Sequence, residues 1–209
     1  MSSVVANKVE FQNITLLVEP TVYCPREDSF LLADAVKEFA TGKVLDMGTG
    51  SGIQAIVASG KKEVTSIVAV DANKIALQCA QRNAEKNKVA KKITFIERDL
   101  FENINSESEQ FDTIIYNPPY VPVEKEEKRD AESMAWYGGL NGRDYVDSFL
   151  ERFPDFLSKN GKLLLLQSSL NVPEATEKKL AQLGFSFKVY GTAAFFFEKI
   201  FVLVIQRQK

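Results

Sequence analysis

The regular alternation of apolar runs with helical patterns constrains this chain more than any other feature. Runs rich in β-branched residues recur at 43–46, 66–71, 92–97, 111–116, 161–168, 185–190 and 200–206. Apolar residues at helical spacing occupy 30–39, 75–84 and 145–153. Strands that alternate with helices build a parallel sheet with helices on both faces. We therefore predict an α/β fold with a doubly wound, seven-stranded sheet, in which the last two strands form an antiparallel pair.

The length and composition fit one globular domain. The chain has 209 residues, of which 45% are hydrophobic and 26% are charged, and such values are typical of a domain with a sizeable core. We expect one structural domain, in which residues 1–40 form an N-terminal extension and a first helix and residues 41–209 form the main body. Asp28, Asn73 and Asn141 are the predicted N-terminal caps of three helices.

Several classes of function are excluded by residues that the sequence lacks. It contains no histidine, which removes imidazole bases, Ser/His/Asp nucleophiles and the commonest zinc ligand, so we predict no metal site. Cys24 and Cys79 form no CxxC pair, so a reducing, cytoplasmic setting fits best. No apolar run reaches the length of a membrane span, and the N-terminus does not resemble a secretion signal.

A glycine-rich turn follows the first predicted strand. Residues 44–52 read Val-Leu-Asp-Met-Gly-Thr-Gly-Ser-Gly, a short strand that leads into glycines and then into a helix. Gly48, Gly50 and Gly52 carry no side chain, so the backbone can turn tightly and a ligand can approach the N–H groups at the helix start. An ordinary turn can have the same sequence, and this motif alone is weak.

Asp71 ends the next strand, about twenty residues after the glycines, which is the spacing of nucleoside-binding folds. A carboxylate at that place can accept both hydrogen bonds from a ribose diol. A helix cap or a solvated strand end is the alternative interpretation of Asp71. The glycine turn and Asp71 together indicate a nucleoside cofactor, and they leave NAD open.

The strand at 111–116 ends in Asn117-Pro118-Pro119-Tyr120. Residues before a proline are extended and prolines have no N–H, so this loop is stiff and presents acceptors. Hydride transfer needs no such loop, but a planar amide or amine nitrogen is a poor nucleophile that has to be oriented. The Asn117 side-chain oxygen and the Pro118 carbonyl can accept its two hydrogens, while the Tyr120 ring packs on the flat group. A plain Pro-Pro turn is the alternative.

Three further features stay open. Asp99 follows the strand at 92–97 and can accept from an adenine amine with Leu100 beside the ring, although a surface acid explains it equally well. The segment 121–140 contains a charged run at 124–130 and is either a substrate-facing flap or a solvated loop. The block Phe195-Phe196-Phe197 is either core or exposed.

Taken together, these residues resemble the HemK-like glutamine methyltransferases of class 1 translation release factors, in the short eukaryotic and archaeal branch. Three segments carry the resemblance: Val-Tyr-Cys-Pro-Arg-Glu-Asp-Ser-Phe-Leu-Leu at 22–32, the Asn117 loop, and Ala-Trp-Tyr-Gly-Gly-Leu-Asn-Gly-Arg at 135–143. Many nitrogen methyltransferases share the Asn-Pro-Pro-Tyr loop, but the combination of the three segments is much narrower. The similarity extends from residue 22 to the end of the chain.

This resemblance implies a Rossmann-like, seven-stranded class I methyltransferase sheet with S-adenosylmethionine as cofactor, bound by residues 41–209. The implied substrate is the glutamine of the Gly-Gly-Gln loop of a class 1 release factor. The implied cofactor-binding residues are Ser29, Asp46, Gly48, Gly50, Gly52, Asp71, Asp99 and Leu100. The implied catalytic residues are Asn117, Pro118 and Tyr120, and these three bind the substrate together with Pro119. Some relatives carry glutamate at the position of Asp46, and the charge is kept.

The resemblance also implies a partner, a small zinc-binding activator subunit that would form a heterodimer with this chain. We expect it to pair with an edge of the sheet, such as the strand at 93–96, because an uncovered apolar edge strand favours aggregation.

Two alternatives belong to other classes of function. The same loop serves enzymes that methylate adenine or guanine amines in RNA or DNA, but 26 basic against 28 acidic residues give a net charge of −2 and no excess of positive charge for a nucleic acid. A cofactor-binding interaction module without turnover would be expected to carry a damaged Asn117 loop or glycine turn, and both are intact.

Overall fold

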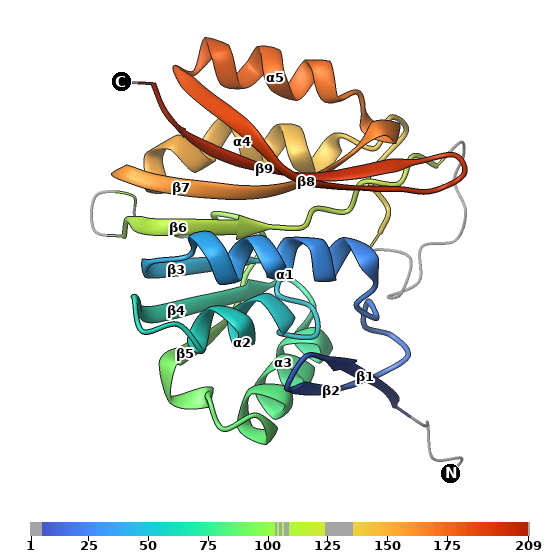
Figure 1. Cartoon of the computed structure of the whole chain (residues 1–209), viewed down its shortest axis with the longest axis vertical. Helices are drawn as coiled ribbons and strands as arrows, with labels where there is room; N and C mark the ends of the chain where they lie inside the picture. The colour runs from blue at the N-terminus through green and yellow to red at the C-terminus, as the bar shows by residue number, and fades with distance from the viewer. Residues whose placement is uncertain (1–5, 103, 105, 107–108, 124–135, 209) are drawn as a thin grey trace.

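The structure is a computed structural model, and it describes residues 6–102, 104, 106, 109–123 and 136–208. Within these residues the main sheet has seven strands in the order β5-β4-β3-β6-β7-β9-β8 (Figure 1). Its strands are β3 (Gly42–Met47), β4 (Val64–Asp71), β5 (Ile93–Glu97), β6 (Phe111–Tyr116), β7 (Leu157–Ser168), β8 (Phe185–Ala194) and β9 (Lys199–Arg207). The helices are α1 (Glu27–Phe39), α2 (Ile53–Ser59), α3 (Lys74–Lys86), α4 (Asp144–Phe156) and α5 (Pro173–Gln182), with short 3₁₀ turns η1 (Ala90–Lys92) and η3 (Ser169–Asn171).

The predicted doubly wound sheet is confirmed. Strands β5, β4, β3, β6 and β7 pair in parallel, whereas β9 is antiparallel to both of its neighbours, β7 and β8. The chain builds the sheet outward from β3 to β5 and then returns to place β6 on the other side of β3. Such a reversal opens a crevice at the carboxyl edge of the sheet, where doubly wound folds bind their ligands.

Two apolar cores lie on opposite faces of the sheet. One face packs against α1, α2 and α3, and α1 and α2 lie in front of the strands in Figure 1. The other face packs against α4 and α5, with a cluster of buried phenylalanines from α4 at its centre. Strands that are buried on both faces consist of continuous apolar runs, and this pattern made them recognisable in the sequence.

The N-terminal region contains a hairpin that the sequence pattern did not predict. Strands β1 (Asn7–Phe11) and β2 (Ile14–Val18) pair in register as a separate two-stranded sheet. The Leu17 backbone N–H donates to the Asn83 side-chain oxygen on α3 at 2.8 Å, and Leu16 and Val18 are buried in the core on that face. A two-stranded hairpin is marginal alone, so its formation depends on this packing more than on its own sequence. Helix α5 was also not predicted.

One of the three predicted helix caps is confirmed. The Asn73 side chain accepts a hydrogen bond from the Ile75 N–H at the start of α3. Asp28 is not a cap: Arg26 holds the cap position of α1, and Asp28 lies within the first turn with its side chain turned to other partners. Asn141 accepts from the Arg143 N–H, but Arg143 itself precedes α4, so Asn141 forms a turn before the helix.

The three consecutive phenylalanines between β8 and β9 are exposed, with Phe196 fully in solvent. The charged run at 124–130 lies outside the described residues, so its interpretation as a flap or a loop stays open. Within the described part of the chain, no helix is long and apolar enough to cross a membrane.

Candidate active site

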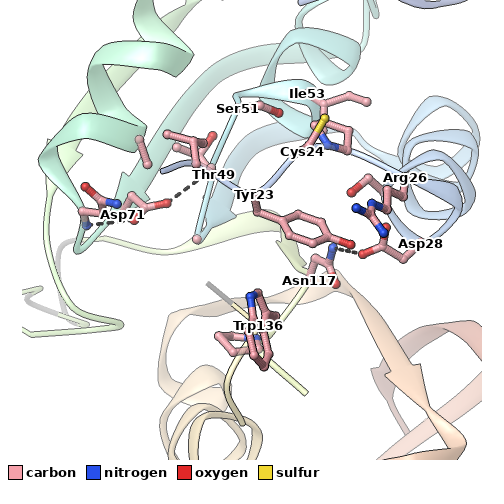
Figure 2. Close-up of a pocket in the computed structure, with 18 of the residues that line it drawn as sticks. Tyr23, Cys24, Arg26, Asp28, Thr49, Ser51, Ile53, Asp71, Asn117 and Trp136 are labelled. Atoms are coloured by element: carbon pink, nitrogen blue, oxygen red, sulfur yellow. Dashed lines mark hydrogen bonds between the residues drawn. The ribbon is translucent and has the colours of Figure 1, made fainter. Parts of the chain in front are cut away.

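A cavity of about 570 Å³ lies at the carboxyl edge of the sheet, where the turns after β3, β4 and β6 meet the start of α1 (Figure 2). Its walls come from Asn7 in β1 and from four further segments: most of residues 20–29, the glycine turn with the start of α2, the end of β4 with α3, and the Asn117 loop with Trp136. Segments far apart in the chain therefore converge on one site, as the reversal of strand order between β3 and β6 dictates.

The glycine turn is fixed from below by Asp46, at the end of β3. One carboxylate oxygen of Asp46 accepts from the Thr49 hydroxyl at 2.7 Å and from the Ala55 N–H at 3.1 Å. Asp46 is almost completely buried, and burial, as the largest cause, raises the pKa of its carboxyl to about 7. Asp46 therefore holds the turn in place by hydrogen bonds within the protein.

Two positions of this turn require glycine, each for a different structural reason. Gly52 has a φ of +86°, and a Cβ there would lie 3.0 Å from the backbone and side chain of Ala80, so only glycine lets α3 approach the turn. Gly50 has a φ of +54°, and its N–H donates to Asp71 at 2.9 Å. A turn with a bare backbone on its cavity side can bind a ligand that no side chain obstructs.

Asp71 joins the glycine turn to α3. One of its carboxylate oxygens accepts from the Gly50 N–H and the other accepts from the Asn73 N–H at 2.8 Å. Burial raises the pKa of the Asp71 carboxyl, against the lowering effect of these two donors. Each carboxylate oxygen can accept more than one hydrogen bond, so Asp71, which lines the cavity, keeps acceptor capacity for a ligand.

On the opposite wall, Asn117 is held by an acidic residue from α1. The Asn117 Nδ2 donates to Asp28 Oδ2 at 2.9 Å, and Figure 2 shows this contact at the side of the cavity. The Asn117 Oδ1 is buried and accepts no hydrogen bond from the described part of the chain. Burial first, and the negative charge of Asp28 second, raise the pKa of the neighbouring Tyr23 hydroxyl. A buried polar atom normally has a hydrogen-bond partner, so the Asn117 Oδ1 can accept a hydrogen bond from a ligand in the cavity.

The Asn117 loop rests on the glycine segment that precedes α4. The Val121 N–H donates to the Trp136 carbonyl, and the Gly138 N–H donates to the Val121 carbonyl, both at 3.0 Å. Gly142 has a φ of +70°, and a Cβ there would clash with the Tyr120 carbonyl oxygen. The Gly-Gly-Leu-Asn-Gly-Arg segment thus acts as a support that lets two stretches of backbone approach closely.

Arg143 anchors this support to the end of the molecule that carries α5. It is 4% exposed, and its guanidinium donates to the carbonyls of Asn171 and Val172 and to the Asp147 carboxylate. Each nitrogen of the buried guanidinium donates at least one hydrogen bond, and its charge is paired with Asp147, as a buried charge requires.

Eight of the residues predicted from the sequence to form the site line this cavity: Ser29, Gly48, Gly50, Asp71, Asn117, Pro118, Pro119 and Tyr120. Four do not line it within the described residues: Asp46 and Gly52, which lie beneath and behind the glycine turn, and Asp99 and Leu100, which follow β5. For these four, direct contact with a cofactor stays a prediction.

Some cavity residues were not assigned a role in the site from the sequence, although Asp28 was predicted to cap a helix. Tyr23, Asp28 and Trp136 lie within the segments that carried the resemblance, so their motifs marked the region without giving the role. Gln54 lies at the start of α2, donates to the Ser29 carbonyl at 2.9 Å, and keeps its Oε1 buried without a partner among the described residues. Nothing in the local sequence distinguishes Gln54 from an ordinary helical glutamine.

The cavity fits S-adenosylmethionine in its chemistry. The volume lies within the range of cofactor sites. A bare glycine turn suits the close approach of a nucleoside amino acid, and Asp71 has the acceptors that a ribose diol needs. Asp28 and Asp71 also place carboxylates in the wall of the cavity, which suits a cationic sulfonium.

A seven-stranded sheet with this strand order, a glycine turn after its first parallel strand and an Asn-Pro-Pro-Tyr loop after its fourth define a class I methyltransferase. The family model of the methyltransferase small domain matches residues 13–136, which is more than half of the chain.

Similar proteins indicate a narrower group within this family. A protein of Methanocaldococcus jannaschii with the provisional name of protein N5-glutamine methyltransferase is 39% identical over 93% of this chain and 96% of its own length. The human methyltransferase HEMK2 is 35% identical over 78% of this chain and 79% of its own. The release factor glutamine methyltransferase of Geobacter sulfurreducens is 31% identical over 75% of this chain and 56% of its own length.

Among solved structures, the E. cuniculi Mtq2–Trm112 complex, described as responsible for methylation of the eRF1 termination factor, has a chain that matches this one. Its TM-score is 0.68 at 26% identity, over 90% of this chain and 99% of that one. The present chain belongs to the methyltransferase small domain family, among the HemK-like S-adenosylmethionine-dependent enzymes.

Proposed function

We propose that this enzyme transfers a methyl group from S-adenosylmethionine to the glutamine side-chain amide of the Gly-Gly-Gln loop of a class 1 translation release factor. The observation that carries the proposal is the buried Asn117 Oδ1 in the wall of the cavity, which has no hydrogen-bond partner among the residues that the structure describes. A planar NH₂ group is the natural donor for such an acceptor. The relatives named for glutamine methylation support the choice of amide over other nitrogens.

The cofactor is proposed to lie along the glycine turn, with Gly48 and Gly50 against its amino-acid part and Asp71 accepting from its ribose. Ser29, in the first turn of α1, also lines the cavity. Asp99 and Leu100 are proposed to hold the adenine, and Asp46 to support the turn through its hydrogen bonds to Thr49 and Ala55. When bound, S-adenosylmethionine supplies an electrophilic methyl group.

The acceptor side is proposed to orient the nitrogen. Asn117 Oδ1 accepts one amide hydrogen and the Pro118 carbonyl accepts the other, so the nitrogen lone pair is directed into the cavity and enriched in electrons. The Tyr120 ring packs on the flat amide, and Pro119 keeps the loop stiff. Positioning of this kind can supply roughly 7–11 kcal/mol of the barrier. A strong base is not needed, because the nitrogen loses its proton readily only after it has been alkylated.

The experiment is transfer of labelled methyl from S-adenosylmethionine to a release factor. We expect label on the wild-type release factor and no label on one whose loop glutamine is replaced. Asn117→Ala should lower kcat by roughly 100- to 1000-fold, as the loss of one oriented transition-state contact does elsewhere, while the Kd for the cofactor changes by less than about threefold. Label that enters RNA or DNA instead, and still depends on Asn117, would mean that the methyl acceptor is a base amine and not a glutamine amide.

We also propose that a small activator subunit of the Trm112 type pairs with β5. This strand forms one edge of the main sheet, and its Phe95 and Ile96 are only partly covered. The E. cuniculi relative is described as a complex with such a subunit. Zinc in the subunit is an expectation from the family resemblance.

A charged residue on the edge of a sheet discourages strand pairing, so Thr94→Lys on β5 should weaken the complex. Thr65→Lys is the matched control, because Thr65 is also exposed but lies on the interior strand β4. Co-purification and light scattering would report the heterodimer. If the complex is equally stable with both variants, the activator subunit does not bind at β5.

A further inference from the structure

Asp28 is the one residue whose side chain, within the described part of the chain, holds the Asn117 side chain from outside its own loop. It lies in the first turn of α1, is 4% exposed, and accepts from the Asn117 Nδ2 at 2.9 Å across 89 positions of sequence. Its other oxygen, Oδ1, is buried and without a partner among the described residues. A buried carboxylate is costly to maintain, and helix capping does not explain this one, because Arg26 holds the cap position.

We infer that Asp28 is a positioning residue for Asn117, whose carboxylate fixes the Asn117 amide with its nitrogen toward α1 and its oxygen toward the cavity. The inference rests on the proposed function, since it assigns the orientation on which Asn117 depends as an acceptor. An asparagine amide can rotate by half a turn and exchange its oxygen and nitrogen. The rotated amide would present a donor to the substrate, and it would place an oxygen against a carboxylate.

The energetic preference follows from the charge of Asp28. A hydrogen bond to an ionised group shifts an equilibrium by roughly 10- to 150-fold, and the rotated state would lose this bond and gain repulsion between two acceptors. The carboxylate also polarises the amide and strengthens the acceptor at its far end. Asp28 therefore acts through Asn117 and need not touch the substrate.

Tyr23 is a second neighbour of the Asp28 carboxylate, and a hydrogen bond to Asp28 is among the causes that raise the pKa of the Tyr23 hydroxyl. Tyr23 and Tyr120 lie close enough for the charge of Asp28 to act on them, and burial is the largest cause that raises the pKa of both hydroxyls. Both tyrosines therefore stay neutral around neutral pH. Besides Asp28, the charged groups that act on these tyrosines are Arg26 on Tyr23 and Glu198 on Tyr120.

The first test is Asp28→Ala, with Asp34→Ala as the control, because Asp34 is an exposed aspartate on the same helix. We expect kcat for Asp28→Ala to fall at least about tenfold, with the cofactor Kd, measured by calorimetry, unchanged within about threefold. Asp34→Ala should keep the wild-type kcat. A wild-type kcat for Asp28→Ala would overturn the inference, and so would a loss explained entirely by weaker cofactor binding.

The second test exchanges the two side chains and separates positioning from folding. In Asn117→Asp alone, two carboxylates face each other and share a proton, which raises the pKa of the pair. Its activity should therefore fall as the pH rises, because only the protonated pair keeps a hydrogen bond and an inward-facing oxygen. In the double variant Asp28→Asn with Asn117→Asp, the new amide donates to the new carboxylate, so activity at about pH 8 should exceed that of the single variant roughly tenfold.

A double variant that is no more active than Asn117→Asp at any pH would contradict the inference. Both tests compare variants on whichever acceptor the wild-type enzyme labels. A wild-type enzyme that labels another planar amine and not a release factor would therefore remove the proposed glutamine substrate, while the dependence of Asn117 on Asp28 would still be measured.

Discussion

The glycine turn and the Asn117 loop form opposite walls of one cavity, but they are held in different ways. In the glycine turn, the polar atoms pair with neighbours that are 3, 9 and 21 residues apart in the sequence. In the Asn117 loop, the partner of Asn117 lies 89 residues away, and the Asn117 Oδ1 is unpaired within the described part of the chain. The first wall is held by local contacts and keeps acceptor capacity at Asp71, whereas the second depends on tertiary packing and leaves the Asn117 Oδ1 without a partner among the described residues.

This difference predicts that changes in the two walls separate binding from turnover. After Asn117 itself, the support beneath the Asn117 loop should give the largest effect. Gly142→Ala would force a side chain into a left-handed backbone, which costs about 1–2 kcal/mol, and against the Tyr120 carbonyl, which costs about 1–3 kcal/mol more. Because a small displacement of a reacting group can cost roughly 100-fold, we expect kcat to fall by up to that factor, with little change in cofactor Kd.

Gly184→Ala is the matched control for this change. Gly184 has a similar φ of +77°, and a Cβ added there would meet no described atom within 4 Å. The free energy of unfolding of Gly184→Ala, measured in urea, should therefore fall only by the backbone cost of about 1–2 kcal/mol. Its kcat should stay at the wild-type value. If Gly142→Ala is no worse than Gly184→Ala in stability and activity, the support does not position the loop.

Asp71→Asn changes the wall formed by the glycine turn, and we expect it to affect cofactor binding more than turnover. The amide can accept at only one atom, so one of the two backbone donors, Gly50 or Asn73, loses its partner. We expect the Kd for S-adenosylmethionine to rise by roughly 10- to 100-fold, whereas kcat at saturating cofactor stays within about threefold of wild type. Steady-state kinetics with varied cofactor would separate the two. A fall in kcat with an unchanged Kd would mean that the two walls are not independent.

The buried Asp46 makes a prediction about pH. The pKa of its carboxyl is about 7 in the folded protein, against about 4 in an unfolded chain. Between those values the folded state keeps a proton that the unfolded state has lost, so this group lowers the free energy of unfolding by about 1.4 kcal/mol per pH unit as the pH rises. The loss is complete above the folded pKa of about 7.

Asp46→Asn cannot titrate, so it should flatten this part of the stability profile. Urea unfolding at several pH values between about 4 and 7 would give the slope for both proteins, and the other acids contribute equally to each. Equal slopes in the two proteins would show that Asp46 ionises in the folded state as easily as in the unfolded one.

The fold was predictable because its pattern is repeated along the chain. Buried parallel strands are continuous apolar runs, and all seven were recognised, together with the antiparallel pair at the end. The hairpin of β1 and β2 was missed because its strands are short and gain their stability from contacts with Asn83 and the core. Helix α5 was missed because it buries few residues, chiefly Thr176 and Leu180.

The site was predictable to the extent that its contacts are local. The glycine turn and Asp71 follow a fixed spacing, and the Asn117 loop has a distinctive sequence. The role of Asp28 was not visible, because sequence position suggests a helix cap, and only the fold brings α1 against the end of β6. For Asp46, the fold adds hydrogen bonds to Thr49 and Ala55 that the sequence did not indicate, and its contact with the cofactor stays a prediction.

The smallest predicted effect concerns Asn73, whose side chain and backbone N–H have separate roles beside the glycine turn. The Asn73 side chain caps α3 through the Ile75 N–H, whereas its backbone N–H donates to Asp71. Asn73→Ala removes the cap and leaves the backbone donor, so stability should fall by about 1 kcal/mol and the cofactor Kd should stay within about threefold. Thermal unfolding and calorimetry on the same sample would measure both. A larger rise in Kd would mean that the Asn73 side chain, which lines the cavity, contacts the cofactor itself.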